Sequence, residues 1–91
     1  MFGYRLNIQA EEDLTRIFEY GMGRFGYFQA LKYYDEFYGC FSKIAKKPYM
    51  FSDASHLRMG YRSCVCGVDT IYYKINSDVI EIMAIIGKQD F

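Results

Sequence analysis

The chain has 91 residues, of which 52% are hydrophobic and 20% aromatic, with ten Tyr, eight Phe and no Trp. Eleven basic residues balance eleven acidic ones, and neither side of Pro48 departs from neutrality by more than one charge. Proteins that neutralise nucleic-acid phosphates usually have a basic surplus, so this balance argues against direct DNA binding. The length predicts a single domain over residues 1–91, and the tyrosine content suits a protein that binds another protein.

No stretch approaches the roughly eighteen apolar residues of a membrane-spanning helix, and residues 1–9 lack the features of a signal peptide. We therefore expect a cytoplasmic protein with no membrane association. The cysteines are Cys40, Cys64 and Cys66, and in a reducing compartment they are most simply small apolar residues. Their spacing with His56 matches no standard zinc motif, so we expect no metal and no cofactor.

Residues 2–6 alternate apolar and polar side chains and predict a strand. A helix is predicted to follow directly from Asn7, a typical N-cap residue, because the apolar side chains after it recur at intervals of three and four. Gly21 and Gly23 each cost about 1 kcal/mol relative to Ala inside a helix. We therefore expect the last turns of this helix to be loose, with a stop near Gly26. Close packing against the next helix is the alternative explanation of the glycines.

A second helix is predicted for residues 27–45, ending before Pro48, which cannot continue a helical hydrogen-bond ladder. It carries two apolar seams, wider together than one packed face requires. One interpretation packs one seam on a sheet and the other on the first helix. The alternative leaves Tyr33 and Phe37 partly exposed for a partner helix. Residues 47–56 are predicted to form a loop, in which the lone histidine is solvated.

Residues 57–91 contain three short runs of β-branched and aromatic residues separated by turn residues, which predicts three antiparallel strands in a meander. In the last run four alternating apolar residues are predicted to share one face of the sheet. They are Ile80, Ile82, Ala84 and Ile86. The whole chain therefore predicts a two-layer α+β fold, in which an N-terminal strand and a helical hairpin belong with an antiparallel sheet of four strands in the order β-α-α-β-β-β.

Several short motifs occur in this order, and the most specific is Arg-x-Gly-Tyr-Arg at residues 58–62. With these motifs in place, the chain resembles the ParE branch of the RelE/ParE superfamily of toxins from type II toxin–antitoxin modules. The segments that carry the resemblance are Tyr4–Leu6, Ala10–Leu14, Arg24–Gly26, Lys47–Pro48, Leu57–Arg62, Ile71–Tyr73 and Ile85–Asp90.

The resemblance implies a toxin that is neutralised by a ParD-type antitoxin and acts by binding and inhibiting DNA gyrase. RelE-like relatives instead cut mRNA on the ribosome, using basic side chains on the sheet and near the C-terminus. For that catalytic role this chain offers only Arg62 and Lys88, with Cys64 where a second basic residue is common. We therefore expect inhibition by binding. A ribosome-dependent endoribonuclease, or a degenerate toxin that only binds its antitoxin, remain the alternatives.

The resemblance also implies two sets of contact residues. Arginines on the toxin are expected to pair with acidic residues of the antitoxin tail, and the end of the last strand is expected to contact the target. Ile86 stands where many ParE-like sequences have a His, which leaves the identity of the target open. The predicted antitoxin-binding residues are Arg5, Arg16, Tyr33, Phe37 and Arg58. The predicted target-binding residues are Arg62, Gly87, Lys88, Gln89 and Asp90.

Overall fold

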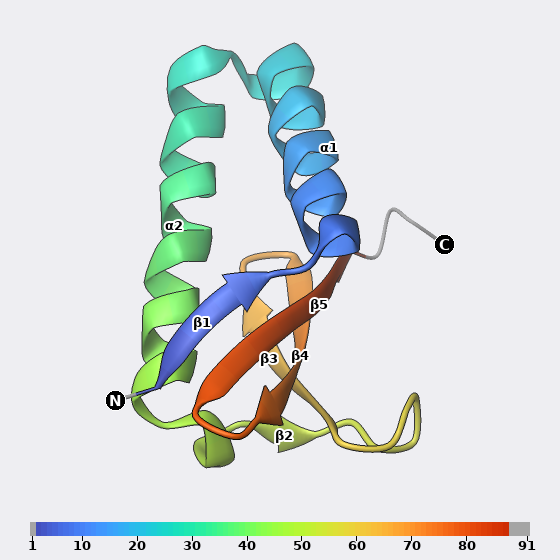
Figure 1. The fold of residues 1–91 in the computed structure, drawn as a ribbon. Coiled ribbons are helices and arrows are strands. Elements are labelled where there is room, and N and C mark those ends of the chain that lie inside the picture. The colour runs from blue at the N-terminus through green and yellow to red at the C-terminus, as the bar shows by residue number, and fades with distance from the viewer. Residues whose placement is uncertain (1, 88–91) are drawn as a thin grey trace.

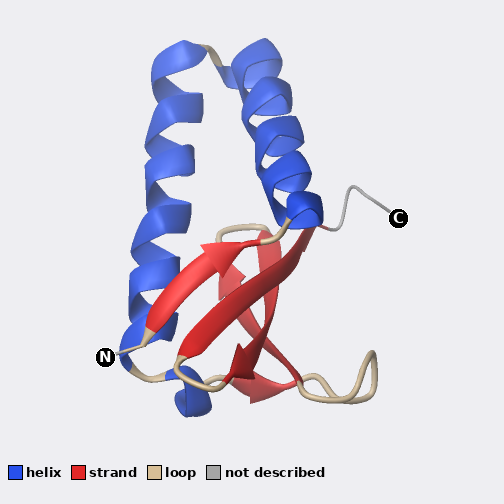
Figure 2. Cartoon of the chain, in the orientation of Figure 1, coloured by secondary structure: helices blue, strands red, loops and turns tan. Residues whose placement is uncertain are grey.

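The structure is a computed structural model that describes residues 2–87. Two helices form a hairpin that packs on one face of a five-stranded sheet (Figures 1 and 2). This arrangement confirms the predicted two-layer α+β architecture. The elements in chain order are β1 (Gly3–Leu6), α1 (Ile8–Phe25), α2 (Tyr27–Lys46), the 3₁₀ turn η1 (Pro48–Met50), β2 (Ser52–Asp53), β3 (Tyr61–Cys66), β4 (Asp69–Asn76) and β5 (Val79–Gly87).

The first helix begins where the sequence predicts, because the Asn7 side chain accepts a hydrogen bond of 2.8 Å from the Ala10 N–H and satisfies a donor that the helix leaves unpaired. The expected loose end is wrong, since α1 continues regularly to Phe25. Gly21 explains the difference. A Cβ added there would lie 3.3 Å from the Cβ of Ala30 on α2, so this glycine permits the close helix packing that was the alternative.

The sheet has the strand order β1-β5-β4-β3-β2. The predicted meander of β3, β4 and β5 is confirmed, with antiparallel pairing throughout. The first strand pairs in parallel with β5, so Gly3–Leu6 lies beside the first half of the last strand although the two are far apart in sequence. The sheet has five strands where four were predicted, because Ser52 and Asp53 form a short edge strand against β3.

A β-bulge at Met83 shifts the register between β4 and β5. Before the bulge, Ile82 points into the core and is fully buried; after it, Ile85 does so. Ala84 and Ile86 are only partly buried. The predicted shared face of the last strand is therefore wrong beyond Ile82, because one extra residue in a strand moves all later side chains to the opposite face.

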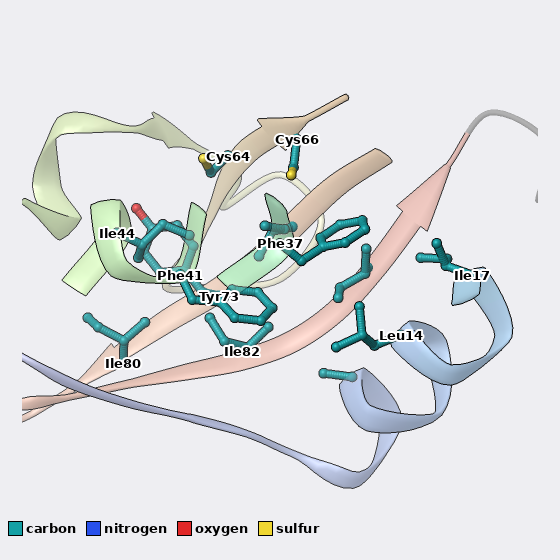
Figure 3. Packing of buried hydrophobic residues seen from close by; sticks show 13 residues of the cluster. Leu14, Ile17, Phe37, Phe41, Ile44, Cys64, Cys66, Tyr73, Ile80 and Ile82 are labelled. Atoms are coloured by element: carbon teal, nitrogen blue, oxygen red, sulfur yellow. The ribbon is translucent and has the colours of Figure 1, made fainter. Parts of the chain in front are cut away.

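The core lies between the hairpin and the inner face of the sheet (Figure 3). Phe37 and Phe41 of α2 are fully buried and face Tyr73 and Ile82 of the sheet. The thiols of β3 also point inward, and burial raises the pKa of Cys64 to about 11. This thiol is therefore uncharged at neutral pH and packs as an apolar group.

Residues 2–87 offer neither a membrane-spanning helix nor a metal-binding cluster. No helix there has both the length and the apolarity that crossing a bilayer requires. No group of three or more His, Cys, Asp or Glu side chains in the same residues is arranged to hold a metal ion.

Candidate functional site

A groove of about 390 Å³ opens between α1, α2 and the turn that joins β3 to β4. Most of its walls are aliphatic or aromatic, which is typical of a surface that accepts apolar side chains. Six of the side chains that shape it are Leu14, Ile17 and Phe25 of α1, Ala30 and Tyr33 of α2, and Val68 of the turn.

The Tyr33 hydroxyl holds the turn against α2. It lies 2.7 Å from Asp69 Oδ2 and 2.9 Å from the Cys66 carbonyl oxygen, and it accepts a hydrogen bond of 3.3 Å from the Val68 N–H. Burial, followed by the bond to the Asp69 carboxylate, raises the pKa of Tyr33. The phenol is therefore protonated at neutral pH and donates a hydrogen bond to this corner of the groove.

Gly67 completes the same corner. Its φ of 61° lies in the left-handed region that favours glycine. A Cβ at this position would also come within 2.6 Å of the Tyr33 ring and hydroxyl. Both constraints exclude any larger residue at position 67. The turn therefore packs closely against Tyr33 and forms a rigid side of the groove.

The outer surface of the hairpin carries a ladder of aromatic rings. Phe18 of α1 makes an edge contact with Tyr34 at 5.4 Å, and Tyr38 continues the ladder at 5.3 Å. The two tyrosine hydroxyls lie 3.4 Å apart, and this hydrogen bond, more than burial, raises the pKa of Tyr38 to about 12. Aromatic side chains with polar tips suit a surface that alternates between water and a partner.

The start of α1 is tied to the end of the sheet by a buried carboxylate. Asp13 accepts a hydrogen bond of 2.9 Å from the Ile85 N–H and one of 2.8 Å from Gln9 Nε2. Arg16 Nη2 lies 3.4 Å from Asp13 Oδ1 and 3.5 Å from the Ile85 carbonyl oxygen. These contacts fix α1 beside β5.

The predicted antitoxin-binding residues do not share one surface. Tyr33 and Phe37 border the groove, but Phe37 is fully buried, with its ring 4.8 Å from that of Tyr33. The prediction that Phe37 is partly exposed is wrong because this seam of α2 faces the sheet. Arg5 forms an ion pair of 3.1 Å with Glu81, and Arg58 is exposed in the loop after β2.

Arg62, which was predicted to contact the target, is engaged within the fold. Its guanidinium donates a hydrogen bond of 2.7 Å to the Phe51 carbonyl oxygen and a longer one of 3.4 Å to the Tyr49 carbonyl oxygen. The guanidinium carbon also lies 5.4 Å from the centre of the Tyr49 ring. Arg62 thus anchors the segment between α2 and β2 to the sheet.

Gly87, the other predicted target residue that the structure describes, lies away from Arg62. Arg62 pairs with Tyr73, whereas Gly87 pairs with Asp69, four positions distant along β4. At about 3.3 Å per strand residue this separation is about 13 Å along the strand alone. The structure therefore does not bring Arg62 and Gly87 together, and Lys88, Gln89 and Asp90 lie outside the described residues.

Sequence reasoning missed the groove residues that lie near the ends of elements. Tyr20 and Phe25 line the groove near the end of α1 and are largely exposed, as is Val68 on the turn. The three-and-four spacing of apolar residues in this helix extends to Phe25 and predicts a buried position, which is wrong because Phe25 lines the groove and is largely exposed. Only the packing of Gly21 on Ala30 shows how close the two helices come.

Comparisons with known proteins agree with one another. Residues 4–90 match the profile of a family described as the ParE toxin of the type II toxin–antitoxin system parDE. The toxin ParE1 of Caulobacter vibrioides is 35% identical over 85 residues, which cover 93% of this chain and 88% of that protein. A solved structure of the chromosomal ParDE toxin–antitoxin system from P. aeruginosa has the same fold, with a TM-score of 0.84, 16% identity and 96% of both chains covered.

Proposed function

The chain belongs to the ParE family of toxins from parDE type II toxin–antitoxin systems, and on that premise we propose that its groove binds the tail of a cognate ParD-type antitoxin. The observation that carries the proposal is the exposed apolar cavity between α1, α2 and the β3–β4 turn. A disordered tail that folds on its partner must bury much apolar surface to offset the entropy of ordering. The apolar lining of the groove supplies part of that surface.

The occupant best suited to the groove is an amphipathic helix of the antitoxin. Helical partners place side chains spaced by three and four residues into apolar grooves, and the long groove between two antiparallel helices accepts such a row. Phe25 and Val68 both line it and are 63% and 68% exposed. Both side chains lose their contact with water when the helix docks.

A matched pair of phenylalanine variants tests the groove. Phe25 lines it, whereas Phe28, 84% exposed at the start of α2, does not. We expect Phe25→Ala to weaken the affinity for the antitoxin by about tenfold or more, as truncation of an aromatic anchor does, and Phe28→Ala to leave it unchanged. Calorimetric titration with the antitoxin measures both. Equal affinities of the two variants would contradict the groove as the docking site.

For the target, we propose inhibition of DNA gyrase by binding, without covalent chemistry by the toxin. RNA cleavage needs cations near the scissile phosphate and groups that move protons. Among the described residues of β3, β4 and β5 the cations are Arg62 and Lys74, which the alternation of the strands places on opposite faces. Arg62 is already bonded to backbone carbonyls. These observations support binding over cleavage.

A supercoiling assay with purified gyrase tests the target directly. We expect the purified toxin to inhibit supercoiling and the antitoxin, added in equal amount, to restore it. The toxin is added in parallel to translating ribosomes, and the mRNA is examined for new ends. Cut mRNA together with unimpaired gyrase would replace this proposal with the endoribonuclease alternative.

A further inference from the structure

The charge of the chain is unevenly distributed although its sum is zero. Residues 43–62 carry five basic side chains and one acidic one, whereas residues 8–40 carry three basic and six acidic ones. Residues 43–62 comprise the last turn of α2, η1, β2, the following loop and the start of β3, and they lie at the end of the molecule opposite the helix connection (Figure 1). We call this region the basic end. The molecule thus has an acidic helical body and a basic end.

Apolar side chains are exposed among these cations. Met59 is 91% exposed and Met50 is 67% exposed, and Tyr49 and Leu57 are also mostly in water. Methionine, tyrosine and arginine are enriched in protein interfaces. Exposed apolar side chains with charges beside them are typical of a surface that another protein covers.

The basic end is held in a defined conformation. Arg62 donates to the Phe51 carbonyl, and the Tyr73 hydroxyl donates to the Pro48 carbonyl, so two side chains of the sheet fix η1. In the loop the Ala54 N–H bonds to the Tyr61 carbonyl at 2.8 Å. A surface that is already ordered loses little conformational entropy when a partner docks on it.

The charges at this end favour an acidic partner. Lys43, Lys46, Lys47 and Arg58 are all exposed. The acidic side chains nearby are Asp53, which accepts a hydrogen bond of 2.7 Å from the Ser55 hydroxyl, and Asp78 in the β4–β5 turn, whose carbonyl oxygen bonds to the Gly3 N–H. A positive surplus remains after both are counted, and charges of opposite sign on a partner give it affinity, orientation and a faster encounter.

We propose that the basic end is a second docking surface, distinct from the groove, which binds an acidic and partly apolar surface of the target protein. A nucleic acid would neutralise the cations but give the exposed methionines and Leu57 no apolar partner, so a protein surface fits the whole region better. The inference rests on the proposed function because it assumes that the toxin has a target protein. It does not require that target to be gyrase.

Two double variants with the same change in net charge test the surface. Lys46→Glu/Lys47→Glu reverses two cations of the basic end, and Arg24→Glu/Lys32→Glu reverses two exposed cations of the helical hairpin that do not line the groove. Each toxin is expressed under an inducible promoter and growth is followed. We expect the basic-end variant to arrest growth at least tenfold less effectively than wild type and the hairpin variant to act like wild type.

Measurement of antitoxin binding distinguishes a variant that has lost the docking surface from one that no longer folds. Both double variants are expected to bind the antitoxin with wild-type affinity, since neither changes the groove. Met59→Ser gives a second, uncharged probe of the basic end, and it is expected to reduce growth arrest with antitoxin binding intact. Unchanged growth arrest by the basic-end variant, or a wild-type chain that arrests no growth, would overturn the inference.

Two further outcomes identify the partner. If the wild type binds a 30-base-pair DNA duplex alone and the basic-end variant does not, the partner is a nucleic acid and the protein interpretation is overturned. If the wild type arrests growth without inhibiting gyrase, and only the basic-end variant loses the arrest, the gyrase proposal fails while the docking surface stands. Inhibition of gyrase that is lost in the basic-end variant supports both.

Discussion

Single side chains hold the groove and the basic end in place. Tyr33 fastens the β3–β4 turn to α2, and Arg62 fastens the segment after α2 to β3. Both side chains were predicted to contact partners, and both have a structural role that the sequence does not reveal. A tyrosine or an arginine has the same chemistry in either role, and only the position of nearby carbonyl groups distinguishes them.

Replacement of Tyr33 by Phe removes one hydroxyl and keeps the ring. The hydroxyl lies within hydrogen-bond distance of the Asp69 carboxylate, the Cys66 carbonyl oxygen and the Val68 N–H. Loss of a hydrogen bond to a buried polar group costs about 1–3 kcal/mol. We expect Tyr33→Phe to lower the free energy of unfolding by that amount in urea titration. Tyr34→Phe, which loses only a bond of 3.4 Å to another hydroxyl, is the control and is expected to change little.

Tyr73 makes the folded protein less stable as the pH rises into the alkaline range. Its ring is fully buried, and burial raises its pKa from 10.0 to about 12. The unfolded chain therefore releases this proton at a lower pH than the folded chain, so the stabilising effect is complete below pH 10 and is lost as the pH rises from 10 to 12. Between pH 9 and pH 11 we expect Tyr73 to account for about 1 kcal/mol of the decrease in the free energy of unfolding.

The check is urea unfolding of the wild type and of Tyr73→Phe at both pH values. At pH 9 the variant is expected to be less stable than the wild type, because it lacks the hydrogen bond to the Pro48 carbonyl. Its free energy of unfolding is expected to fall by less than that of the wild type between pH 9 and pH 11. The same decline in both proteins would mean that other groups, such as Tyr33 and Tyr38, cause the pH dependence.

At the scale of elements, the two glycines of α1 differ in what surrounds them. A Cβ at Gly23 would meet nothing within 4 Å, whereas one at Gly21 would press on Ala30 at 3.3 Å. Replacement of glycine by alanine in a helix gains roughly 0.5–1 kcal/mol when there is room. We expect Gly23→Ala to stabilise the protein by this amount, and Gly21→Ala to be about 1 kcal/mol less stable than Gly23→Ala. Thermal unfolding compares them, and equal midpoints would contradict close packing at Gly21.

The elements themselves were predictable where a pattern extends over several residues. Both helices and the meander follow from apolar periodicity, and the N-cap at Asn7 marks the start of α1. The bulge at Met83 was not predictable, since an inserted residue leaves the β-branched run intact and changes only which side chains face inward. The two-residue strand β2 is too short to have a pattern, and its pairing with β3 is a tertiary contact.

For the whole molecule, the sequence indicated that a protein-binding surface was to be expected but did not locate the groove. The tyrosine-rich helices indicated a protein-binding surface, but the groove also needs the β3–β4 turn, which is distant in sequence. Counting charges on either side of Pro48 hid the basic end, because this division separates Lys43, Lys46 and Lys47 from Arg58 and Arg62. The fold brings Arg62 back to the segment that follows α2, where its guanidinium bonds to the Phe51 carbonyl oxygen.

Docking of the antitoxin is expected to stabilise the entire toxin. A ligand that binds only the folded state adds about 2.7 kcal/mol at a concentration of 100 times its dissociation constant. For a domain of this size that free energy corresponds to a rise in melting temperature of roughly 10–20 °C. Differential scanning calorimetry with and without antitoxin measures the rise. Phe28→Ala is expected to keep it, and Phe25→Ala to reduce it at the same antitoxin concentration.

The parallel pairing of β1 with β5 has a consequence for synthesis. Val79, the partner of Gly3 in the sheet, follows it by 76 residues along the chain. The first strand therefore waits unpaired until β5 has been synthesised, and a nascent chain that has not yet reached β5 cannot close this part of its sheet. Ribosomal synthesis of Val79–Gly87 thus precedes assembly of the complete sheet.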